Sequence, residues 1–177
     1  MTSTWLEVNS NLHHFTKYED HPKPGITFYD IGGVLAEPFQ WARLVNDMSD
    51  AALAYDPDGL IAVDARGFLI AAAMGFYLSL PVVMARKPGK LPGNKAQVEY
   101  ELEYGTDRLE LQQDKIQKGG RYIIVDDVLA TGGTARAVKQ LVSEAGAEAV
   151  ALFTALAIPQ LNGAQHVDLP TVTWAKT

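Results

Sequence analysis

The sequence predicts an α/β domain built around a mostly parallel sheet that is flanked by helices. Three apolar runs have the length and composition of buried strands: GLIAV at 59–63, RYIIV at 121–125 and AVALFTALAI at 149–158. Segments with helical spacing separate them, and strands that alternate with helices are typical of parallel sheets. We find no repeat, linker or second domain in the 177 residues.

The N-terminal elements follow from local patterns. Apolar residues predict a short helix over residues 4–15, and the prolines and glycines of residues 21–35 (HPKPGITFYDIGGVL) predict a structured loop. Pro38 then favours the start of a helix, whose apolar face comprises Trp41, Leu44, Val45, Met48 and Ala52.

The central elements include one stretch that resembles a membrane span. Residues 67–85 contain no charged side chain. Pro81 divides them into a buried helix at about 68–79 and a short strand at 82–85, so we expect no contact with a membrane. Further on, alternating apolar and acidic residues predict a hairpin over residues 98–111, and a helix follows residue 135 and ends at Gly146.

Composition and charge exclude several functions. The net charge of −6 argues against a nucleic-acid-binding protein. The lack of cysteine excludes disulfides and thiolate catalysis, and it suits a reducing cytoplasm. No secretory leader is expected, because the first residues lack a basic segment followed by an apolar run. The histidines lack metal-ligand spacing, and we expect no site role for any of them: His13, His14, His21 and His166.

The strongest chemical signal is YIIVDDVLATGGTA at residues 122–135, where a strand, two aspartates, a glycine turn and a helix follow one another. The turn lacks the lysine of a nucleotide-triphosphatase loop and the spaced glycines of a dinucleotide site. Its backbone N–H groups can still hold a phosphate at the start of the helix. Asp126 and Asp127 would repel that phosphate but suit sugar hydroxyls, so a sugar phosphate is predicted. The alternative is that both aspartates only cap the turn.

VDDVLATGGTA resembles the phosphoribosyl-diphosphate-binding motif of the type I phosphoribosyltransferases. PKPGITFYD, DARGFL, RKPGKLPG and YELEYGTD resemble the adenine-using branch of that family, over about residues 20–146. The resemblance implies the type I phosphoribosyltransferase fold as a single domain, 1–177. Within it we expect a small N-terminal hood at about 20–36 and a flexible hairpin lid at about 87–111.

The implied function is transfer of the 5-phosphoribosyl group from phosphoribosyl diphosphate to adenine, which gives AMP and pyrophosphate, in a cytoplasmic homodimer. The resemblance assigns the 5′-phosphate and ribose to one group of residues: Asp126, Asp127, Ala130, Thr131, Gly132, Gly133 and Thr134. Mg²⁺ is the implied cofactor, bound mainly through substrate and water, with no direct protein ligand.

Residues 86–95 (RKPGKLPGNK) carry four of the chain's 15 basic residues, and no acid lies between residues 81 and 98. By itself this pattern indicates either an anion-binding loop or a solvated surface loop, the latter above all for Lys95. The resemblance assigns pyrophosphate to Arg86, Lys87 and Lys90, with Arg86 or Lys90 able to reach across a dimer interface. It also assigns pyrophosphate to Arg66, and it suggests a cis peptide near Asp64–Ala65.

The resemblance also implies a catalytic acid and a base site. Glu103 would act near the imidazole nitrogens of the base, although the residues alone do not distinguish it from Glu101. Phe28 would stack on the purine, or alternatively fill the core. The backbone of Thr27 and Tyr29 would read the exocyclic amine, and Val128 would pack on the other face of the base.

The hood departs from the family pattern. The family usually has arginine at the position of Tyr29 and Thr-Pro or Ser-Pro in place of Gly32-Gly33, so we expect a looser hood. A 6-oxopurine therefore remains an alternative base. A regulator that binds phosphoribosyl diphosphate without catalysis is a second alternative, but it would carry a basic face. Residues 159–177 match the family pattern poorly.

Overall fold

The computed structural model describes residues 4–5, 11–101 and 106–177. Its centre is an eight-stranded sheet in the order β1-β10-β9-β8-β4-β5-β7-β6. The pairs from β1 to β5 are parallel, and β7 and β6 add an antiparallel edge. The strands of this sheet are β1 (Thr4–Trp5), β4 (Gly59–Val63), β5 (Val82–Arg86), β6 (Lys95–Glu101), β7 (Thr106–Gln112), β8 (Arg121–Leu129), β9 (Glu148–Ala157) and β10 (Thr171–Lys176).

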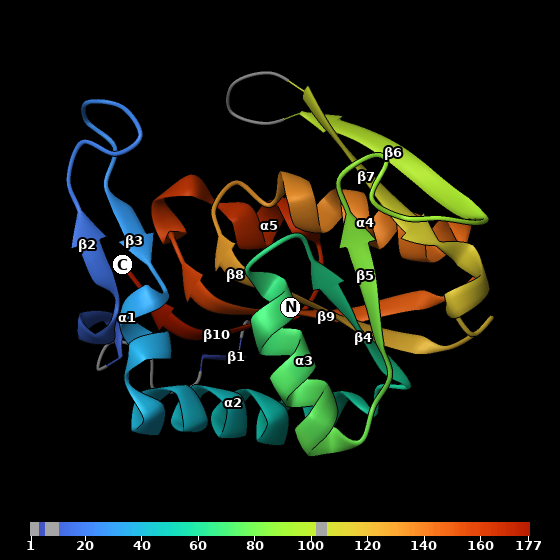
Figure 1. Cartoon of the computed structure of the whole chain (residues 1–177), viewed down its shortest axis with the longest axis horizontal. Coiled ribbons are helices and arrows are strands. Elements are labelled where there is room, and N and C mark those ends of the chain that lie inside the picture. The colour runs from blue at the N-terminus through green and yellow to red at the C-terminus, as the bar shows by residue number, and fades with distance from the viewer. Residues whose placement is uncertain (1–3, 6–10, 102–105) are drawn as a thin grey trace.

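Helices cover both faces of the sheet (Figure 1). One core cluster joins the sheet to α2 and α3, and a second joins it to α4, because the parallel strands carry apolar side chains on both faces. β4 is buried at every position. The helices are α1 (Gly32–Ala36), α2 (Pro38–Ala52), α3 (Gly67–Leu78), α4 (Gly133–Glu144) and α5 (Gly163–Val167).

The order of the strands reverses between β4 and β8. After β4 the chain moves outward to β5, whereas β8, β9 and β10 extend the sheet on the other side of β4. In open α/β sheets, ligands bind at the carboxyl ends of the strands where this reversal occurs. The segments after β4 and β8 therefore lie at the expected position of a site.

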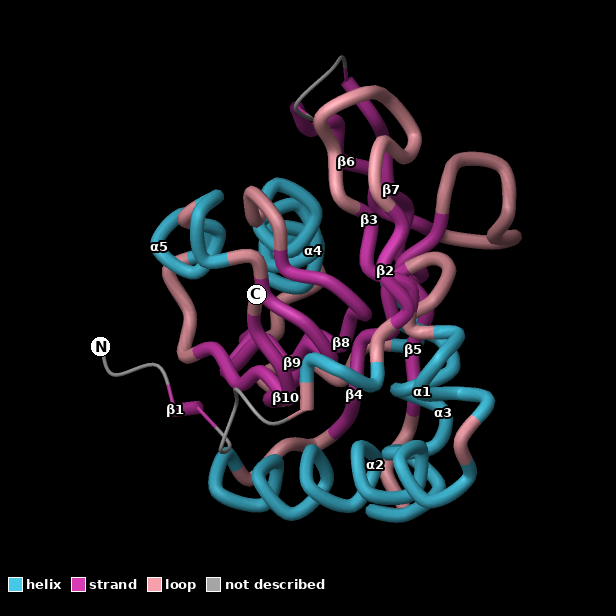
Figure 2. The backbone as a smooth tube through the Cα atoms, turned by 90° about the vertical axis from the view of Figure 1, so that its left-hand side faces the viewer, coloured by secondary structure: helices cyan, strands magenta, loops and turns pink. Residues whose placement is uncertain are grey.

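Two small structures stand above this edge of the sheet. A two-stranded antiparallel hood pairs β2 (Thr16–Tyr18) with β3 (Phe28–Asp30), and the β6–β7 hairpin rises at the other end (Figure 1). Both extend on the same side of the molecule in the perpendicular view (Figure 2). On β6, Val98 and Tyr100 are buried while Glu99 is exposed, which confirms the predicted alternation over these three residues; residues 102–105 lie outside the described part of the chain.

Most of the predicted elements are confirmed, and three are corrected. The helix expected over residues 4–15 is wrong, because Thr4–Trp5 pairs with β10 and Leu12–His14 forms a 3-10 turn. The loop expected over residues 21–35 contains β3 and α1. β8 continues to Leu129, so the two aspartates lie within the strand and not after it.

The stretch at residues 67–85 divides into α3 and β5, as its proline predicts. In the described part of the chain, no helix combines the length and the apolar character that a membrane span needs.

Candidate active site

The two aspartates of β8 have different surroundings. Adjacent residues of a strand point to opposite faces of the sheet. Asp126 lines a pocket of about 300 Å³ together with the phosphate loop. Asp127, which is nearly buried, instead contacts the guanidinium of Arg66. The carboxylates therefore do not both face the loop.

The phosphate loop comprises residues 130–134 and leads directly into α4. Gly132 has φ +84°, a left-handed conformation that favours glycine. Among the described residues, no backbone carbonyl accepts a hydrogen bond from the amides of residues 131–134, as expected at the start of a helix. The same residues line the pocket at the start of α4, where the helix dipole favours an anion.

Burial raises the pKa of Asp126 well above its usual range, and the neighbouring charge of Asp127 raises it further. The amide of Asp127 donates a 2.8 Å hydrogen bond to Asp126 Oδ1, which partly offsets this effect. Among the described residues, Asp127 Oδ2 accepts no well-aligned hydrogen bond although it lies beside Arg66 Nε. Both carboxylates thus keep bonding capacity for a ligand.

Arg66 joins the carboxylates to the hood. It directly precedes α3, and its guanidinium carbon lies 5.3 Å from the ring centroid of Phe28, within the range of a cation–π contact. Gly67 follows, and a Cβ at this position would lie 2.6 Å from the carbonyl oxygen of Val125. The start of α3 therefore lies directly against β8, which brings Arg66 to Asp127.

Arg86 lies at the end of β5, next to the segment that follows β4. Its Nε donates a 3.1 Å hydrogen bond to Asp64 Oδ2, which also accepts one from the Lys87 amide at 3.4 Å. The Asp64–Ala65 peptide is cis, as predicted. Within this chain Arg86 therefore contacts its own Asp64.

The basic loop is tied to the hairpin. Lys87 pairs with Asp107 of β7. The buried Glu110 accepts hydrogen bonds from the Lys95 ammonium at 2.8 Å and the Gly89 amide at 3.1 Å. Reading Lys95 as a solvated residue is therefore wrong, because it anchors the loop. Lys90 is exposed and makes no ion pair with any described residue.

Three of the four residues that the family resemblance assigns to the base lie on or directly before β3. Phe28 is half-buried and meets His21 edge-on, with ring centroids 5.3 Å apart, so it is not simply a core residue. Thr27 Oγ1 donates a 3.0 Å hydrogen bond to Glu19, and Tyr29 packs on the core beneath the hood. Val128 lines the pocket of the phosphate loop.

The glycines at the base of the hood have a packing role. A Cβ on Gly33 would lie 2.4 Å from the carbonyl oxygen of His14, so the helix α1 touches the chain before β2 directly. At Gly32 the nearest atoms belong to the side chain of Asp30. Close backbone contact, and not looseness, explains Gly33.

Three contributing residues were not predicted as part of the site. Thr154 is fully buried on β9, where it pairs with Asp126 of β8, and it lines the same pocket. The sequence signal that could have identified it is a single threonine within an apolar strand. Glu110 interrupts a buried run of leucines in the same way. His166 Nδ1 lies 3.0 Å from the Thr131 carbonyl oxygen, a contact for which the sequence carries no signal. Glu103 lies outside the described residues.

A glycine turn after a carboxylate pair, placed at the strand reversal of a parallel sheet, defines a class of protein that binds sugar phosphates. The family model of the phosphoribosyl transferase domain matches residues 38–168.

Similar proteins place the chain more narrowly. It is 41% identical over 157 residues to the adenine phosphoribosyltransferase of Rhodospirillum centenum, and the aligned region covers 89% of this chain and 92% of the relative. It is 48% identical over 148 residues to that of Sphingopyxis alaskensis, covering 84% and 80%. The crystal structure of the Thermoanaerobacter pseudethanolicus adenine phosphoribosyltransferase superposes with a TM-score of 0.90 at 36% identity, covering 93% of this chain and 96% of that one. The chain belongs to the adenine phosphoribosyltransferases of the phosphoribosyltransferase family.

Proposed function

We propose that this enzyme transfers the 5-phosphoribosyl group from phosphoribosyl diphosphate to adenine, giving AMP and pyrophosphate in purine salvage. The observation that carries the choice of base is the set of relatives, which share 36–48% identity with this chain and are adenine phosphoribosyltransferases. A structural neighbour from Saccharomyces cerevisiae, 32% identical, was solved in complex with adenine and an imino-altritol bisphosphate.

The proposed reaction is a displacement at the anomeric carbon. A nitrogen of adenine forms the new bond to this carbon as the bond to the pyrophosphate oxygen breaks, and the leaving group takes the bonding electrons. Positive charge develops on the ribose ring, so holding the reactants in line and stabilising pyrophosphate contribute most to the rate.

Each part of the substrate has its own set of residues in this proposal. The 5′-phosphate binds the amides of residues 130–134, and the ribose hydroxyls bind Asp126 and Asp127. The pyrophosphate is neutralised by Arg66, Arg86, Lys87 and Lys90. The pocket beside Asp126 and the convergence of Arg66 and Arg86 on the carboxyl ends of β4, β5 and β8 support this division.

Mg²⁺ is the proposed cofactor. The donor set here is two neighbouring aspartates, and the described residues hold no group of three or more side chains that could bind a metal ion alone. By the family resemblance we propose that Mg²⁺ would be bound mainly through phosphoribosyl diphosphate and water, at the end of the site that carries Asp126 and Asp127. When bound, the ion neutralises charge on the pyrophosphate.

Glu103 is proposed to exchange a proton with a ring nitrogen of the base. Phe28 and Val128 are proposed to contact the two faces of the base. The backbone of Thr27 and Tyr29 is proposed to hydrogen-bond the exocyclic amine. The hairpin and the basic loop would close over the reactants and exclude water. A Glu103→Gln variant should lose most turnover, whereas Glu99→Gln on the same hairpin should keep it. Equal turnover in wild type and Glu103→Gln would remove Glu103 from the mechanism.

Pyrophosphate release tests the reaction directly. Enzyme, Mg²⁺ and phosphoribosyl diphosphate are mixed with adenine, hypoxanthine or guanine, and pyrophosphate is measured over time. We expect release with adenine at a much higher kcat/KM than with the oxopurines. Preference for hypoxanthine or guanine would reject adenine alone, and silence with all three bases would reject the transferase function.

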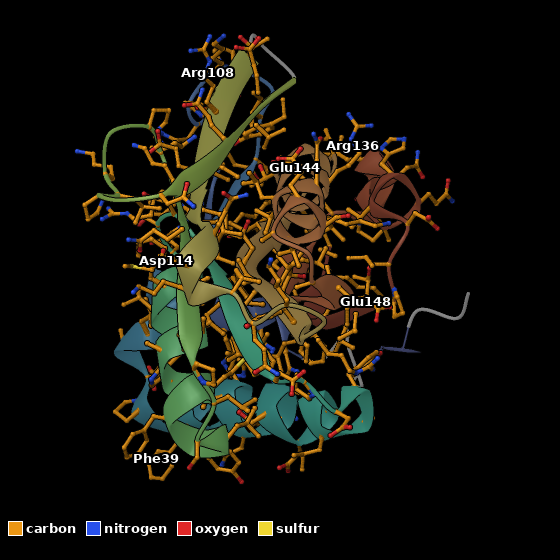
Figure 3. All side chains as sticks on the ribbon, turned by 90° about the vertical axis from the view of Figure 1, so that its right-hand side faces the viewer. Phe39, Arg108, Asp114, Arg136, Glu144 and Glu148 are labelled. Carbon is orange, nitrogen blue, oxygen red and sulfur yellow. The ribbon has the colours of Figure 1, made fainter. Side chains whose placement is uncertain are left out.

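A homodimer is also proposed. Exposed apolar side chains gather on α3 and the neighbouring β5, and an exposed apolar patch of this kind is typical of an interface: Leu69, Phe76, Tyr77, Val82 and Met84. Phe39 of α2 also projects from the surface, 88% exposed (Figure 3). Arg86 shares a strand face with Val82 and Met84, so a partner bound there would border the pyrophosphate residues.

Sedimentation of the wild type and of Phe76→Lys tests the dimer. We expect the wild type to sediment as a dimer. The variant should sediment as a folded monomer, because Phe76 is 91% exposed in the single chain and its replacement disturbs no core contact. A monomeric wild type would reject this proposal without affecting the reaction. As the family resemblance implies, we place the enzyme in the cytoplasm.

A further inference from the structure

We infer that the C-terminal helix α5 positions the phosphate loop, with His166 and Gly163 as positioning residues for the 5′-phosphate. This inference rests on the proposed function, since it concerns the same substrate. It gives a role to α5, which lies at the end of the stretch that the family model matches.

His166 holds one carbonyl of the loop. Its Nδ1 lies 3.0 Å from the Thr131 carbonyl oxygen, and because a carbonyl only accepts, the hydrogen belongs on Nδ1. In a trans peptide the carbonyl and the following N–H point in opposite directions. Fixing the Thr131 carbonyl toward α5 therefore turns the Gly132 N–H away from α5, on the side where this residue lines the pocket.

Gly163 and Gly132 bring the two backbones into direct contact. A Cβ on Gly163 would lie 2.2 Å from the Ala130 carbonyl oxygen, and a Cβ on Gly132 would lie 2.6 Å from the Gly163 carbonyl oxygen. No side chain fits between these segments without a shift of the backbone. The path of the loop is thus defined by α5 as well as by its own sequence.

α5 is itself fastened to α4. Lys139 Nζ donates hydrogen bonds to the carbonyl oxygens of Asp168 at 2.9 Å and Val167 at 3.3 Å, and Val167 is buried. The two helices lie side by side in both views (Figures 1 and 2). The loop is therefore held at one end by the helix that it begins and along its length by α5.

The test compares three variants. His166→Leu removes the donor, whereas His166→Asn places an amide N–H near the position of Nδ1. Gln165→Leu, an exposed neighbour on the same helix, is the matched control. The dissociation constant of phosphoribosyl diphosphate with Mg²⁺ is measured by calorimetry, alongside the KM for each substrate and the melting temperature.

We expect His166→Leu to weaken phosphoribosyl diphosphate binding about five- to tenfold, the effect of one lost hydrogen bond at a loop that binds charge. The KM for the base and the melting temperature should remain close to wild type. His166→Asn should restore affinity to within about twofold, and Gln165→Leu should match wild type. Gly163→Ala, which displaces the Ala130 carbonyl, should weaken binding further.

Unchanged affinity in His166→Leu would overturn the positioning role. A rise in the KM for the base together with a fall in the melting temperature would also overturn it, because that pattern indicates general destabilisation. A wild type that binds no phosphoribosyl diphosphate would overturn both this inference and the proposed function. A wild type that binds it but prefers another base would overturn the adenine assignment alone and leave the His166 comparison valid.

Discussion

Arg66 and Asp127 form an ion pair that joins the proposed pyrophosphate and ribose subsites. The same guanidinium lies against the ring of Phe28 in the hood. Arg66, itself assigned to pyrophosphate, therefore contacts one residue proposed for the ribose and one proposed for the base. The pyrophosphate group of incoming phosphoribosyl diphosphate would compete with Asp127 for Arg66. This competition would free the Asp127 carboxylate for the ribose hydroxyls.

Removing the charge of Arg66 should act mainly on phosphoribosyl diphosphate. We expect Arg66→Gln to lower kcat/KM for this substrate about 100-fold, because a charge-assisted contact to an anion is lost. Steady-state kinetics with both substrates measures this. Arg43→Gln removes a surface arginine of similar exposure, whose pair with Asp47 is 3.6 Å long, and should stay within about twofold.

Asp126→Asn should stabilise the protein at neutral pH while abolishing activity. Because the folded-state pKa of Asp126 is raised, the folded state holds its proton after the unfolded chain has lost it, and wild-type stability falls as pH rises through that window. The advantage of the Asn variant should thus be absent below about pH 4 and grow toward neutral pH.

Melting temperatures at pH 4 and pH 7.5 check this prediction. Asp50→Asn, which changes an exposed carboxylate on α2, serves as the control and should shift neither value appreciably. An Asn variant that is less stable than wild type at pH 7.5 would show that the charge of Asp126 is stabilised in the fold.

Glu110→Gln should loosen the basic loop. The buried carboxylate accepts bonds from Lys95 and Gly89, so its neutral replacement weakens two contacts at once. We expect a loss of about 1–3 kcal/mol in the free energy of unfolding and a higher KM for phosphoribosyl diphosphate. Urea unfolding and kinetics measure both, and the exposed Glu99→Gln should change stability by less than about 0.5 kcal/mol.

Gly33→Ala should destabilise the hood by about 1–3 kcal/mol, because the new methyl group would lie against the His14 carbonyl. Gly32→Ala is the paired control, since its nearest neighbour is the Asp30 carboxylate, which can rotate away. Denaturant unfolding distinguishes them. If both variants behave alike, close packing at Gly33 is not the reason for this glycine.

The sequence predicted the parts of the fold whose signal is local. β4, α3 and α4 can be predicted from the spacing of their apolar residues and from the prolines and glycines that end the elements. The segment over residues 4–15 was misread, because β1 owes its state to pairing with β10, more than 160 residues away in the chain. A two-residue strand carries too little pattern to reveal such a pairing.

The same distinction applies to the site. Asp126, Asp127 and the glycine turn are contiguous, so the motif could be predicted, as could the cis peptide through the family resemblance. The roles of His166, Glu110 and Thr154 arise from contacts between distant segments, and no spacing in the sequence encodes them. The purpose of Gly33 was misjudged because its neighbours, His14 and Thr16, lie on a segment well before it in the chain.

The place of the carboxylates on β8 has a consequence for native-state hydrogen exchange. Val125, directly before them, pairs with Ala62 on one side and Phe153 on the other, so its amide should exchange only when the whole domain unfolds. Each residue of β2 is exposed, and among the described strands β2 pairs with β3 alone, so hood amides should exchange through small local openings. Substitutions at the exposed residues of β2 should therefore cost little global stability, unlike Gly33→Ala at the packed base of the hood, whereas substitutions at the ribose end of the site should affect the whole fold.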